Sequence, residues 1–455
     1  MLQARVAELE GLVRDLAGQV KDLTARLRDQ PPSPRPAAEI PPAPAKKPTG
    51  RKPGGQPGHP PHLKRRLPPD LVQHTVMYVP ATCAACQAAL PKAAGPDDPE
   101  PTWHQVVELP PVLATVTEYQ GHARTCPCCG EVTRAAIPAE VRAHSVGPQL
   151  TGVIGYLTGD QGLSKRGVEE VVEHVFGVPV GLGTVSNLEQ EIAAALAVAH
   201  TQATAAVRDA PVKHVDETGW KENGRKRWLW VAATKVVAVF VIHPYRNLSA
   251  LSALLGREFT GILCSDRWVV YDDWPDPYAR QLCWAHLKRN WEALAERGGA
   301  AKRIGDRFLA IQTAVFELWH LYRGGGCTRA ALADRMMPWV DELEDVLAAG
   351  QRCRDGRTQR FCARLDGEKF GLWTFVETAG VEPTNNHGER VLRRAVLWRR
   401  RSFGCHSASG CRFAERLLTV ATTLRLQGRN VVNFLGESIA AHRAGRPGPK
   451  LLPDG

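Results

Sequence analysis

The sequence predicts a multidomain α/β protein, in which an α/β domain follows a helical N-terminal segment, a cysteine-bearing module and a helical region. At 455 residues the chain exceeds the ~250–300 residues at which a single core stops growing. Apolar residues recur at helical spacing over residues 1–29 and 145–207, whereas residues 211–295 carry short β-branched and aromatic runs. These changes in pattern divide the chain into successive segments.

Residues 1–29 are predicted to form a coiled-coil helix. Apolar side chains follow one another at alternating intervals of three and four residues, with charged residues between them. An amphipathic helix docked on its own globule has a similar pattern, but the alternation and the linker that follows favour self-association into a homo-oligomer. The seam consists of Val6, Leu9, Val13, Leu16, Val20, Leu23 and Leu27.

A basic linker rich in proline and glycine follows over residues 30–66. This composition is typical of an extended and poorly ordered segment. Between Lys46 and Arg66 the linker holds seven lysine or arginine residues and no acid. It is therefore either a solvated charge run or a flexible arm for DNA phosphates. The candidate DNA-binding residues of this arm are Lys46, Lys47, Arg51 and Lys52.

Residues 67–140 are predicted to be a zinc-binding module. Two C-x2-C motifs, formed by Cys83 with Cys86 and by Cys126 with Cys129, each direct two thiolates at one ion. Together they complete the tetrahedral sulfur coordination that Zn²⁺ favours, in a closed and therefore structural site. The alternating segments HTVMYV and HQVVEL predict short strands of a zinc ribbon. The alternative is four unrelated buried thiols.

Residues 141–208 are predicted to be a helical region. The segment SKRGVEEVVEHVFG ends at Gly177, and a second helix begins near Thr184 after a short turn. Two helices across such a turn indicate either a helix-turn-helix DNA reader or an ordinary helical hairpin. The inward face of the second helix is predicted to contain Val185, Leu188, Ile192, Leu196 and Ala199.

Residues 209–442 are predicted to form the α/β domain, with a helical insertion at about 296–380 and a further helical region at 386–442. Residues 443–455, rich in glycine and proline, are predicted to be a flexible tail. The strand candidates are PVKHVD, KRWLWVAAT, KVVAVFVIH, GILCSD and RQLCWA, with a helical piece at 248–256.

Two acids close the first strand candidate. Asp216 and Glu217 are adjacent, and successive side chains of a strand point to opposite faces, so only one of them can reach a given metal. Asp266 ends GILCSD at a comparable place, and carboxylates at the ends of neighbouring strands can hold Mg²⁺ or Mn²⁺ between them. We assign Asp216 and Asp266 to the metal and expect Glu217 to be solvated or ion-paired. The acids expected to be solvated in the following loop are Asp272, Asp273 and Asp276.

Glu389 is the candidate third carboxylate, which would complete a two-metal clamp. It shares a helical face with Leu392 and Val396 and so begins an inward-facing stripe. Two alternatives remain open. Glu382 could be the third acid, and the spacing of Asn386 and Glu389 also fits a capping box.

A run of arginines follows this glutamate. Six arginines lie within residues 390–401. Their guanidinium groups can make bidentate contacts with phosphates where a DNA backbone would enter. The candidate DNA-binding residues of the run are Arg390, Arg393, Arg394, Arg399, Arg400 and Arg401.

The overall composition agrees with a DNA partner. Lysine and arginine outnumber aspartate and glutamate by 58 to 47, a surplus of +11 that favours a polyanionic partner. The longest apolar run, Trp228 to Ile242, contains Lys235 and is shorter than the ~20 residues of a membrane-spanning helix. The charged N-terminus differs from a secretory signal. We therefore expect a soluble, cytoplasmic, nucleoid-associated protein, in which cysteines bind metal or are buried rather than forming disulfides.

Taken in order, these motifs resemble the insertion-sequence 66 family of bacterial DDE transposases. The resemblance extends over nearly the whole chain and includes the RKPGGQPGHPPH linker, the paired C-x2-C motifs, and the HVDET, CSDRWVVYDDW and CWAHLKRNW blocks. Its most specific part is NNHGERVLRRAV with the RRRSFG that follows.

The resemblance implies an RNase H-like catalytic domain with a helical insertion before the last acid. It also implies Mg²⁺-dependent DNA strand cleavage and strand transfer at transposon ends, with target DNA and accessory transposition proteins as further partners. By position, Asp216 ends the first strand, Asp266 ends the fourth, and Glu389 lies on the final helix. His286 in CWAHLKR matches a family position near the active site, or else is a structural histidine at a strand end.

We therefore expect a DNA transposase in which Asp216 and Asp266 hold one ion and Asp216 and Glu389 hold a second. Such a mechanism needs no covalent protein–DNA intermediate, because water and then a 3′-hydroxyl act as nucleophiles. Two alternatives are a DNA-binding regulator with an inactive catalytic domain and a nuclease for branched DNA.

Overall fold

The computed structural model describes residues 66–453 except residues 94, 97, 110–111 and 113. The predicted coiled coil and the basic arm with Lys46, Lys47, Arg51 and Lys52 lie outside the described residues. The described chain divides into two compact units, one ending at Glu108 and one beginning at Leu109. Each unit is described by itself.

The first unit contains little regular structure between residues 66 and 108. A short 3-10 helix, η1, spans Pro69–Leu71, and an isolated antiparallel bridge joins Thr82 to Ala89 around the first C-x2-C turn. The prediction that HTVMYV and HQVVEL form strands is wrong for the described structure, since neither joins a ladder. Their alternation lacks a covering partner, and Met77 and Tyr78 are exposed.

The second unit begins with a hairpin of β1 (Ala123–Thr125) and β2 (Val132–Arg134), which brackets the second C-x2-C turn. A helical region follows and confirms the predicted helix pair. Ser164 caps the first of these helices by accepting a hydrogen bond from the N–H of Gly167, and Gly177 ends it in the left-handed conformation. The region consists of α2 (Ala139–Arg142), α3 (Pro148–Gly155), the π-helical η2 (Tyr156–Asp160), α4 (Lys165–Phe176), α5 (Leu182–Ala195) and α6 (Ala197–Asp209).

A five-stranded mixed sheet forms the centre of the second unit. Its strand order is β5-β4-β3-β6-β7, with antiparallel pairing from β5 to β3 and parallel pairing from β3 to β7. All five strand candidates contribute to it, although the last continues as a helix from Trp284. The strands are β3 (Val212–Glu222), β4 (Arg225–Ala233), β5 (Ala238–His243), β6 (Ile262–Ser265) and β7 (Arg280–Leu282).

The turn between β3 and β4 explains the length of β3. Asn223 and Gly224 connect the paired residues Glu222 and Arg225, with φ angles of 47° and 74°. Two residues with positive φ form the type I′ turn that favours a tight hairpin. The strand therefore runs on from Asp216 to Glu222, and the expectation that Asp216 ends the first strand is wrong.

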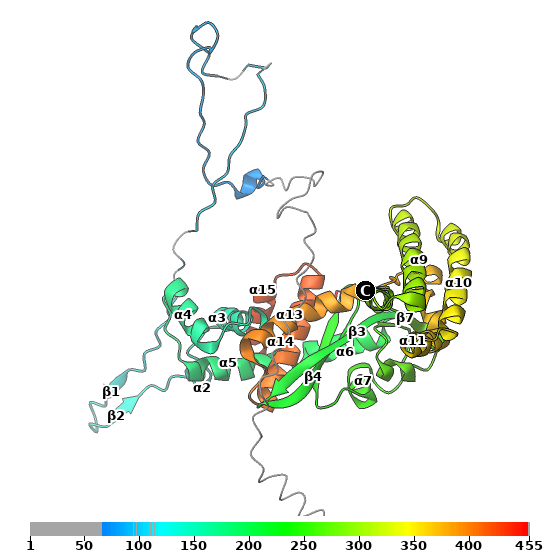
Figure 1. Ribbon diagram of the computed structural model, residues 1–455. Helices are drawn as coiled ribbons and strands as arrows, with labels where there is room; N and C mark the ends of the chain where they lie inside the picture. The colour runs from blue at the N-terminus through cyan, green and yellow to red at the C-terminus, as the bar shows by residue number, and fades with distance from the viewer. Residues whose placement is uncertain (1–65, 94, 97, 110–111, 113, 454–455) are drawn as a thin grey trace, which may run out of the picture. The chain divides into compact units, whose positions relative to one another are not determined.

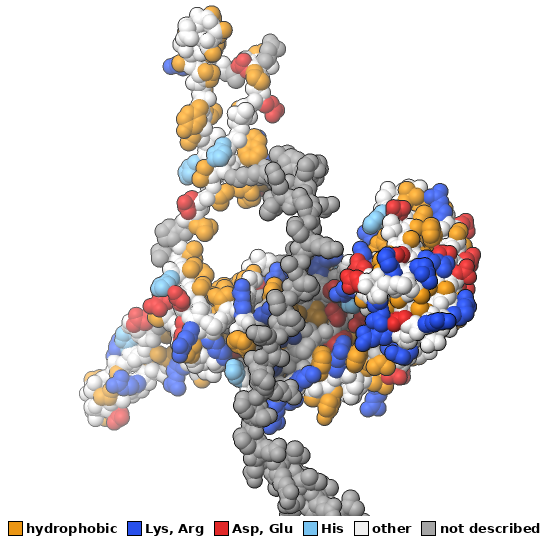
Figure 2. Space-filling model, in the orientation of Figure 1, with side chains coloured by type: hydrophobic (Ala, Val, Ile, Leu, Met, Phe, Trp, Pro, Cys, Tyr) orange, Lys and Arg blue, Asp and Glu red, His pale blue; other side chains and the backbone are white. Residues whose placement is uncertain are grey.

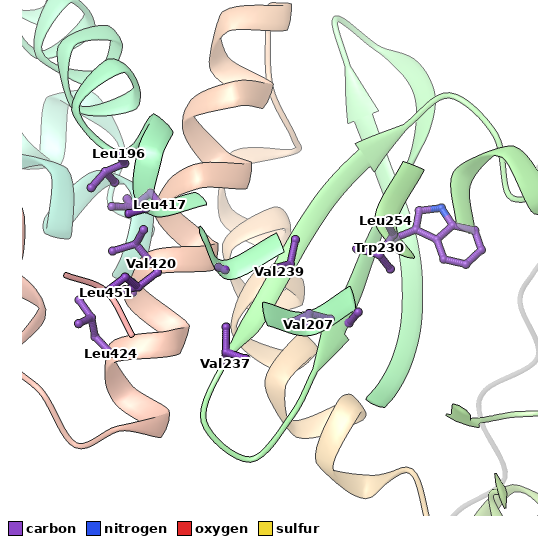
Figure 3. Close-up of a cluster of buried hydrophobic side chains, with 14 of the residues drawn as sticks. Leu196, Val207, Trp230, Val237, Val239, Leu254, Leu417, Val420, Leu424 and Leu451 are labelled. Atoms are coloured by element: carbon purple, nitrogen blue, oxygen red, sulfur yellow. The ribbon is translucent and has the colours of Figure 1, made fainter. Parts of the chain in front are cut away.

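Helices cover both faces of the sheet. Leu229 and Val231 on β4 pack with α13 (Asn386–Ser402), whereas Trp230 between them packs in a cluster with α6 and α7 (Leu248–Leu255). This alternation is the period of a strand that is buried on both faces. Figure 3 shows the second cluster extending to α14 (Ala408–Leu426) through Leu417 and Val420. Leu451 is fully buried in it, so the tail predicted to be flexible is anchored there.

A helical insertion separates β7 from α13, as predicted. Its core is aromatic, with the rings of Trp291 and Phe308 stacked 4.1 Å apart between centroids. The long helices α9 and α10 lie side by side (Figure 1). The elements are α8 (Trp284–Ala295), α9 (Gly299–Arg323), α10 (Arg329–Gln351), α11 (Gly356–Glu368), η5 (Lys369–Leu372) and α12 (Thr374–Glu377). Between β6 and β7 lie η3 (Val269–Asp273) and η4 (Pro277–Ala279), and α15 (Val431–Arg443) follows α14.

Helix α14 covers the free edge of β5 with a ladder of polar side chains. Residues one helical turn apart each accept a backbone N–H from alternate residues of the strand. Thr423 accepts from Ala238 at 3.1 Å and Thr419 from Phe240 at 3.0 Å. Glu415 accepts from the N–H of Ile242 at 2.6 Å. An edge that would otherwise be open to pairing with another chain is thereby closed.

None of the helices in the described residues is long and apolar enough to cross a membrane.

Replacing Thr419 by valine is expected to lower the free energy of unfolding by about 1–3 kcal/mol, because the buried N–H of Phe240 loses its acceptor while the side-chain shape is kept. Denaturant-induced unfolding measures the change. Thr422→Val is the matched control, since the described structure gives this buried side chain no hydrogen bond to β5. Equal losses in the two variants would contradict the role of the ladder.

Candidate active site

The register of the parallel strands aligns three residues at one end of the sheet. Val212 pairs with Ile262 and His214 with Cys264, an offset of 50 residues (262 − 212) that places Asp266 level with Asp216. Leu263 pairs with Arg280, an offset of 17 residues (280 − 263) that places Cys283 level with Asp266. Neighbouring strands lie about 4.8 Å apart. Asp266 directly follows β6, the fourth strand of the domain, and this carboxyl edge is where open α/β sheets bind ligands.

Asp216 lies in an acidic and largely buried environment. Burial and the negative charges of Glu217, Asp266 and Glu389 together raise its pKa from 3.8 to about 7. The N–H of Glu217 donates to its Oδ1 at 2.9 Å and opposes this shift. Asp216 thus interacts electrostatically with both other predicted acids, and a pKa of about 7 leaves it partly protonated at neutral pH unless a cation neutralises the group.

Glu389 lies in the first turn of α13, the helix that packs on the Asp216 face of the sheet. The expectation that this is the final helix is wrong, because α14 and α15 follow. The capping box is not formed either: Asn386 is the first helical residue, and Asn385 is the N-cap. Glu389 Oε1 is 3.4 Å from His286 Nδ1, which brings the predicted support residue to the site.

The three predicted acids are not the tightest ligand group. Within the described part of the chain, potential ligand atoms of Cys283, His286 and Glu389 all lie within 4.8 Å of one another, whereas the three carboxylates together form no such group. Cys283 was missed from sequence, although it stands three residues before His286 in CWAHLKR. A metal-ligand spacing test applied to that block would have found it.

Glu217 points to the other face of β3, as the alternation of a strand requires, but it is not solvated. Its side chain is 2% exposed and forms an ion pair with Arg246 at 2.5 Å. The hydroxyl of Tyr271 also donates to it. The Arg246 guanidinium lies 3.9 Å from the ring centroid of Trp268, and the backbone N–H of Trp268 donates to Asp266 Oδ1 at 2.9 Å. This network connects β3 to the loop that carries Asp266.

Asn385 joins the elements that carry the candidate residues. Its Oδ1 lies 2.9 Å from His214 Nδ1, and its Nδ2 donates to the carbonyl of Val215 at 2.8 Å. Its backbone N–H donates to Cys283 Sγ at 3.1 Å. Asn385 is 2% exposed, and burial lowers the pKa of His214 to about 4, so that the histidine is neutral. Asn385 was missed from sequence, where the adjacent asparagines Asn385 and Asn386 at the start of the helix were the pattern that could have indicated it.

The remaining acid candidates have partners elsewhere. Glu382 forms an ion pair with Arg323 of α9 at 2.8 Å. Asp272, expected to be solvated, forms ion pairs with Arg280 at 3.0 Å and with Arg364 at 3.2 Å. Asp276, for which the same was expected, caps η4. Asp273 is exposed.

The six arginines of α13 fall into two sets. Three are engaged within the protein: Arg394 with Asp160, Arg399 with Thr218 and Gly219, and Arg401 with the carbonyl of Gln161. The other three are exposed and lie at positions i, i+3 and i+10, which share one side of a helix. This exposed stripe consists of Arg390, Arg393 and Arg400. Figure 2 shows acidic and basic side chains interspersed over the helical insertion, at the right of the view, rather than gathered by sign.

The two C-x2-C turns have the same local backbone. The N–H of Cys83 donates to the carbonyl of Ala88 and that of Cys126 to Glu131, five residues on in each case. Gln87 and Gly130, which follow the second cysteine of each turn, both have positive φ. Backbone N–H groups of Ala85 and Cys86 lower the pKa of Cys83, and those of Cys128 and Cys129 lower the pKa of Cys126. Each turn by itself is shaped to present thiolates.

The site thus combines a mixed sheet, acids at the carboxyl edge of its parallel strands and an arginine-rich helix that packs beside them. The family model described as "Transposase IS66 family" matches residues 144–412, more than half of the chain, and the chain therefore belongs to the IS66 family of transposases. The match includes Asp216, Asp266, His286 and Glu389. No curated protein matches the sequence.

Proposed function

We propose that this transposase binds the ends of an insertion sequence and catalyses metal-dependent DNA strand cleavage and strand transfer, with Asp216, Asp266 and Glu389 as its catalytic carboxylates. The observation that carries the proposal is the strand register, which makes Asp216 and Asp266 level at the carboxyl edge of the sheet. The mixed sheet with its helical insertion is compatible with the RNase H-like core that the resemblance implies.

The residues present fit a divalent cation. Asp216, Asp266 and Glu389 provide oxygen ligands, which Mg²⁺ and Mn²⁺ prefer. Like charges raise the pKa of Asp216, and Glu389 Oε1 is buried without a hydrogen-bond partner in the described structure. A cation would relieve both conditions. When bound there, Mg²⁺ would activate the attacking oxygen and stabilise the leaving oxygen of a phosphodiester.

Residues of the chain position these carboxylates and the DNA. Asn385 fixes the start of α13 against β3, and the pair of Glu217 and Arg246 fixes the loop of Asp266. The exposed stripe of Arg390, Arg393 and Arg400 leads along α13 toward Glu389 and supplies phosphate contacts. Arg399 acts within the protein.

The proposed chemistry hydrolyses one phosphodiester and then exchanges another. In cleavage, water adds to the phosphorus and loses a proton, the bond to the 3′-oxygen breaks, and that oxygen takes up a proton to leave as a 3′-hydroxyl. In transfer, that hydroxyl attacks a target phosphodiester, loses its proton and displaces the target 3′-oxygen. No protein side chain becomes esterified.

The test is joining of pre-cleaved ends of the element to a target plasmid with Mg²⁺. Asp266→Ala is expected to lower the rate by about a thousandfold, because a lost metal ligand removes several kcal/mol of transition-state stabilisation. Asp273→Ala is the matched control, since this exposed aspartate lies in the same loop, and its rate should match that of the unmodified protein.

Each outcome of this assay separates the candidate functions. Equal joining by Asp266→Ala and by the unmodified protein would overturn the carboxylate assignment. Cleavage without joining would indicate a nuclease. Binding of the ends without either reaction would indicate a DNA-binding regulator.

We also propose that the C-x2-C turns bind a structural Zn²⁺, as their thiolate-stabilising N–H groups support. Cys126→Ser is expected to lower the bound zinc by one equivalent per chain, measured by elemental analysis of purified protein. Cys128→Ser is the matched control, because this exposed cysteine lies in the same turn and should leave zinc content unchanged. Retention of full zinc by Cys126→Ser would disprove the assignment.

A further inference from the structure

Cys283, His286 and Glu389 form a cluster with mixed sulfur, nitrogen and oxygen donors. Cys283 is the N-cap of α8, His286 lies in the first turn of that helix, and Glu389 projects from the first turn of α13. Their ligand atoms all lie within 4.8 Å of one another. The cysteine is buried, whereas the histidine and glutamate side chains are 31% and 39% exposed, so the cluster is reachable from solvent on one side.

The facing nitrogen and oxygen atoms of this cluster lack hydrogen-bond partners in the described structure. His286 Nδ1 and Glu389 Oε1 face each other at 3.4 Å, and both are buried atoms without a hydrogen bond in the described structure. Buried polar atoms without partners are rare, and an ion is one of the groups that satisfies them. A cation held between the two would satisfy both atoms at once.

Backbone N–H groups surround the sulfur of Cys283. The N–H of Asn385 donates to Cys283 Sγ at 3.1 Å. Burial raises the pKa of the Cys283 thiol, and the N–H groups of Asn385, His286 and Ala285 oppose that rise. A cation bound beside the sulfur would favour the thiolate, which is the form that coordinates metals.

We propose that Cys283, His286 and Glu389 bind one Zn²⁺, and that this ion withdraws Glu389 from the catalytic carboxylates and so inhibits the transposase. Thiolate and imidazole donors select Zn²⁺ over Mg²⁺, which prefers oxygen alone. Zinc bonds of about 2.0–2.3 Å require the donor atoms to converge by roughly an ångström, within the reach of side-chain rotation. Three protein ligands leave the fourth position to water.

The binding part of this inference is independent of the proposed function, whereas the inhibition part rests on it. Metal binding is therefore tested first, with Co²⁺ as an optical probe added to full-length, metal-free protein. Unmodified protein is expected to bind one equivalent more than Cys283→Ser, with the loss of one sulfur-to-cobalt charge-transfer contribution. Cys327→Ser, which changes a cysteine outside the cluster, should keep the full stoichiometry.

A second variant keeps the test decisive if Cys283→Ser folds poorly. His286→Ala changes a half-exposed side chain and is expected to weaken binding of Zn²⁺ at this site by more than about a hundredfold, since a direct ligand matters at least as much as its supporting residues. Competition with a zinc-binding dye measures the affinity. Unchanged stoichiometry in Cys283→Ser, or unchanged affinity in His286→Ala, would overturn the site.

Inhibition is then measured as the ratio of joining rates with and without Zn²⁺ at fixed Mg²⁺. Zn²⁺ should lower the joining rate of unmodified protein at least tenfold and that of His286→Ala much less. If Zn²⁺ binds unmodified protein at this site but changes joining by the same ratio in unmodified protein and in His286→Ala, the inhibitory role is overturned. The binding site itself would then still stand. Absence of joining under every condition would count against the proposed function while the binding result stands.

Discussion

Asp216→Asn is expected to raise the free energy of unfolding above pH 7 by about 1–3 kcal/mol, while joining activity falls by about a thousandfold. Burial and the charges of Glu217, Asp266 and Glu389 raise the pKa of Asp216 to about 7 from an ordinary 3.8. The folded protein therefore binds this proton more tightly than the unfolded chain does. Asparagine can still accept the hydrogen bond from the N–H of Glu217 but carries no charge.

The sign of this effect sets its pH dependence. Between about pH 4 and pH 7 the unmodified protein loses stability as pH rises. In this window the folded state still binds a proton that the unfolded chain has released, and a falling proton concentration therefore disfavours the folded state. Asp216→Asn lacks this loss. The difference in free energy of unfolding between the variant and the unmodified protein therefore grows across that window and is constant above it. Thermal unfolding over a pH series measures it, with Asp273→Asn as a control that should show no difference.

Added Mg²⁺ provides a second readout for the same variant. The cation should stabilise unmodified protein above pH 7, where Asp216 is ionised, and should stabilise Asp216→Asn much less. A variant that is less stable than unmodified protein at pH 8 without metal would contradict the assignment of Asp216 to a repulsive acidic site.

Asn385→Ala is expected to lower the free energy of unfolding by about 2–4 kcal/mol, because His214 Nδ1 and the carbonyl of Val215 both lose a buried partner. Joining by the folded fraction should fall about ten- to a hundredfold, since the start of α13 and Glu389 would no longer be fixed against β3. Chemical denaturation and single-turnover joining measure the two effects.

The adjacent Asn386 offers a matched control for this prediction. It is an exposed asparagine at the first position of α13, and Asn386→Ala should change stability by less than about 0.5 kcal/mol. If Asn385→Ala lost stability but kept its joining rate, Asn385 would be a structural residue without a positioning role.

The strand segments and the face alternation of β3 follow from local sequence, whereas the register and the site depend on contacts between distant segments. Five apolar runs predicted five strands, and the alternation of β3 placed Asp216 and Glu217 on opposite faces. The length of β3 was missed because the Asn223–Gly224 turn was not considered. Glu217 was expected to be solvated or ion-paired; its burial depends on Arg246 and Tyr271, which lie 29 and 54 residues away.

The same limit applies to Asn385 and Cys283. Asn385 contacts His214 across 171 residues and Cys283 across 102, and no local pattern encodes such pairings. The partition of the arginines in α13 was equally hidden, because Arg399 finds its partners on β3. Spacing identified which residue types could act, and only the tertiary structure distinguishes those that face solvent from those that hold the protein together.

The insertion between β7 and α13 has its two ends joined by hydrogen bonds at the sheet. The N–H of Trp284 donates to the carbonyl of Pro383 at 3.0 Å, and the N–H of Asn385 donates to the sulfur of Cys283, so the chain leaves and returns at nearly one point. A change in the length of α9 or α10 therefore does not need to change where the chain leaves and rejoins the sheet.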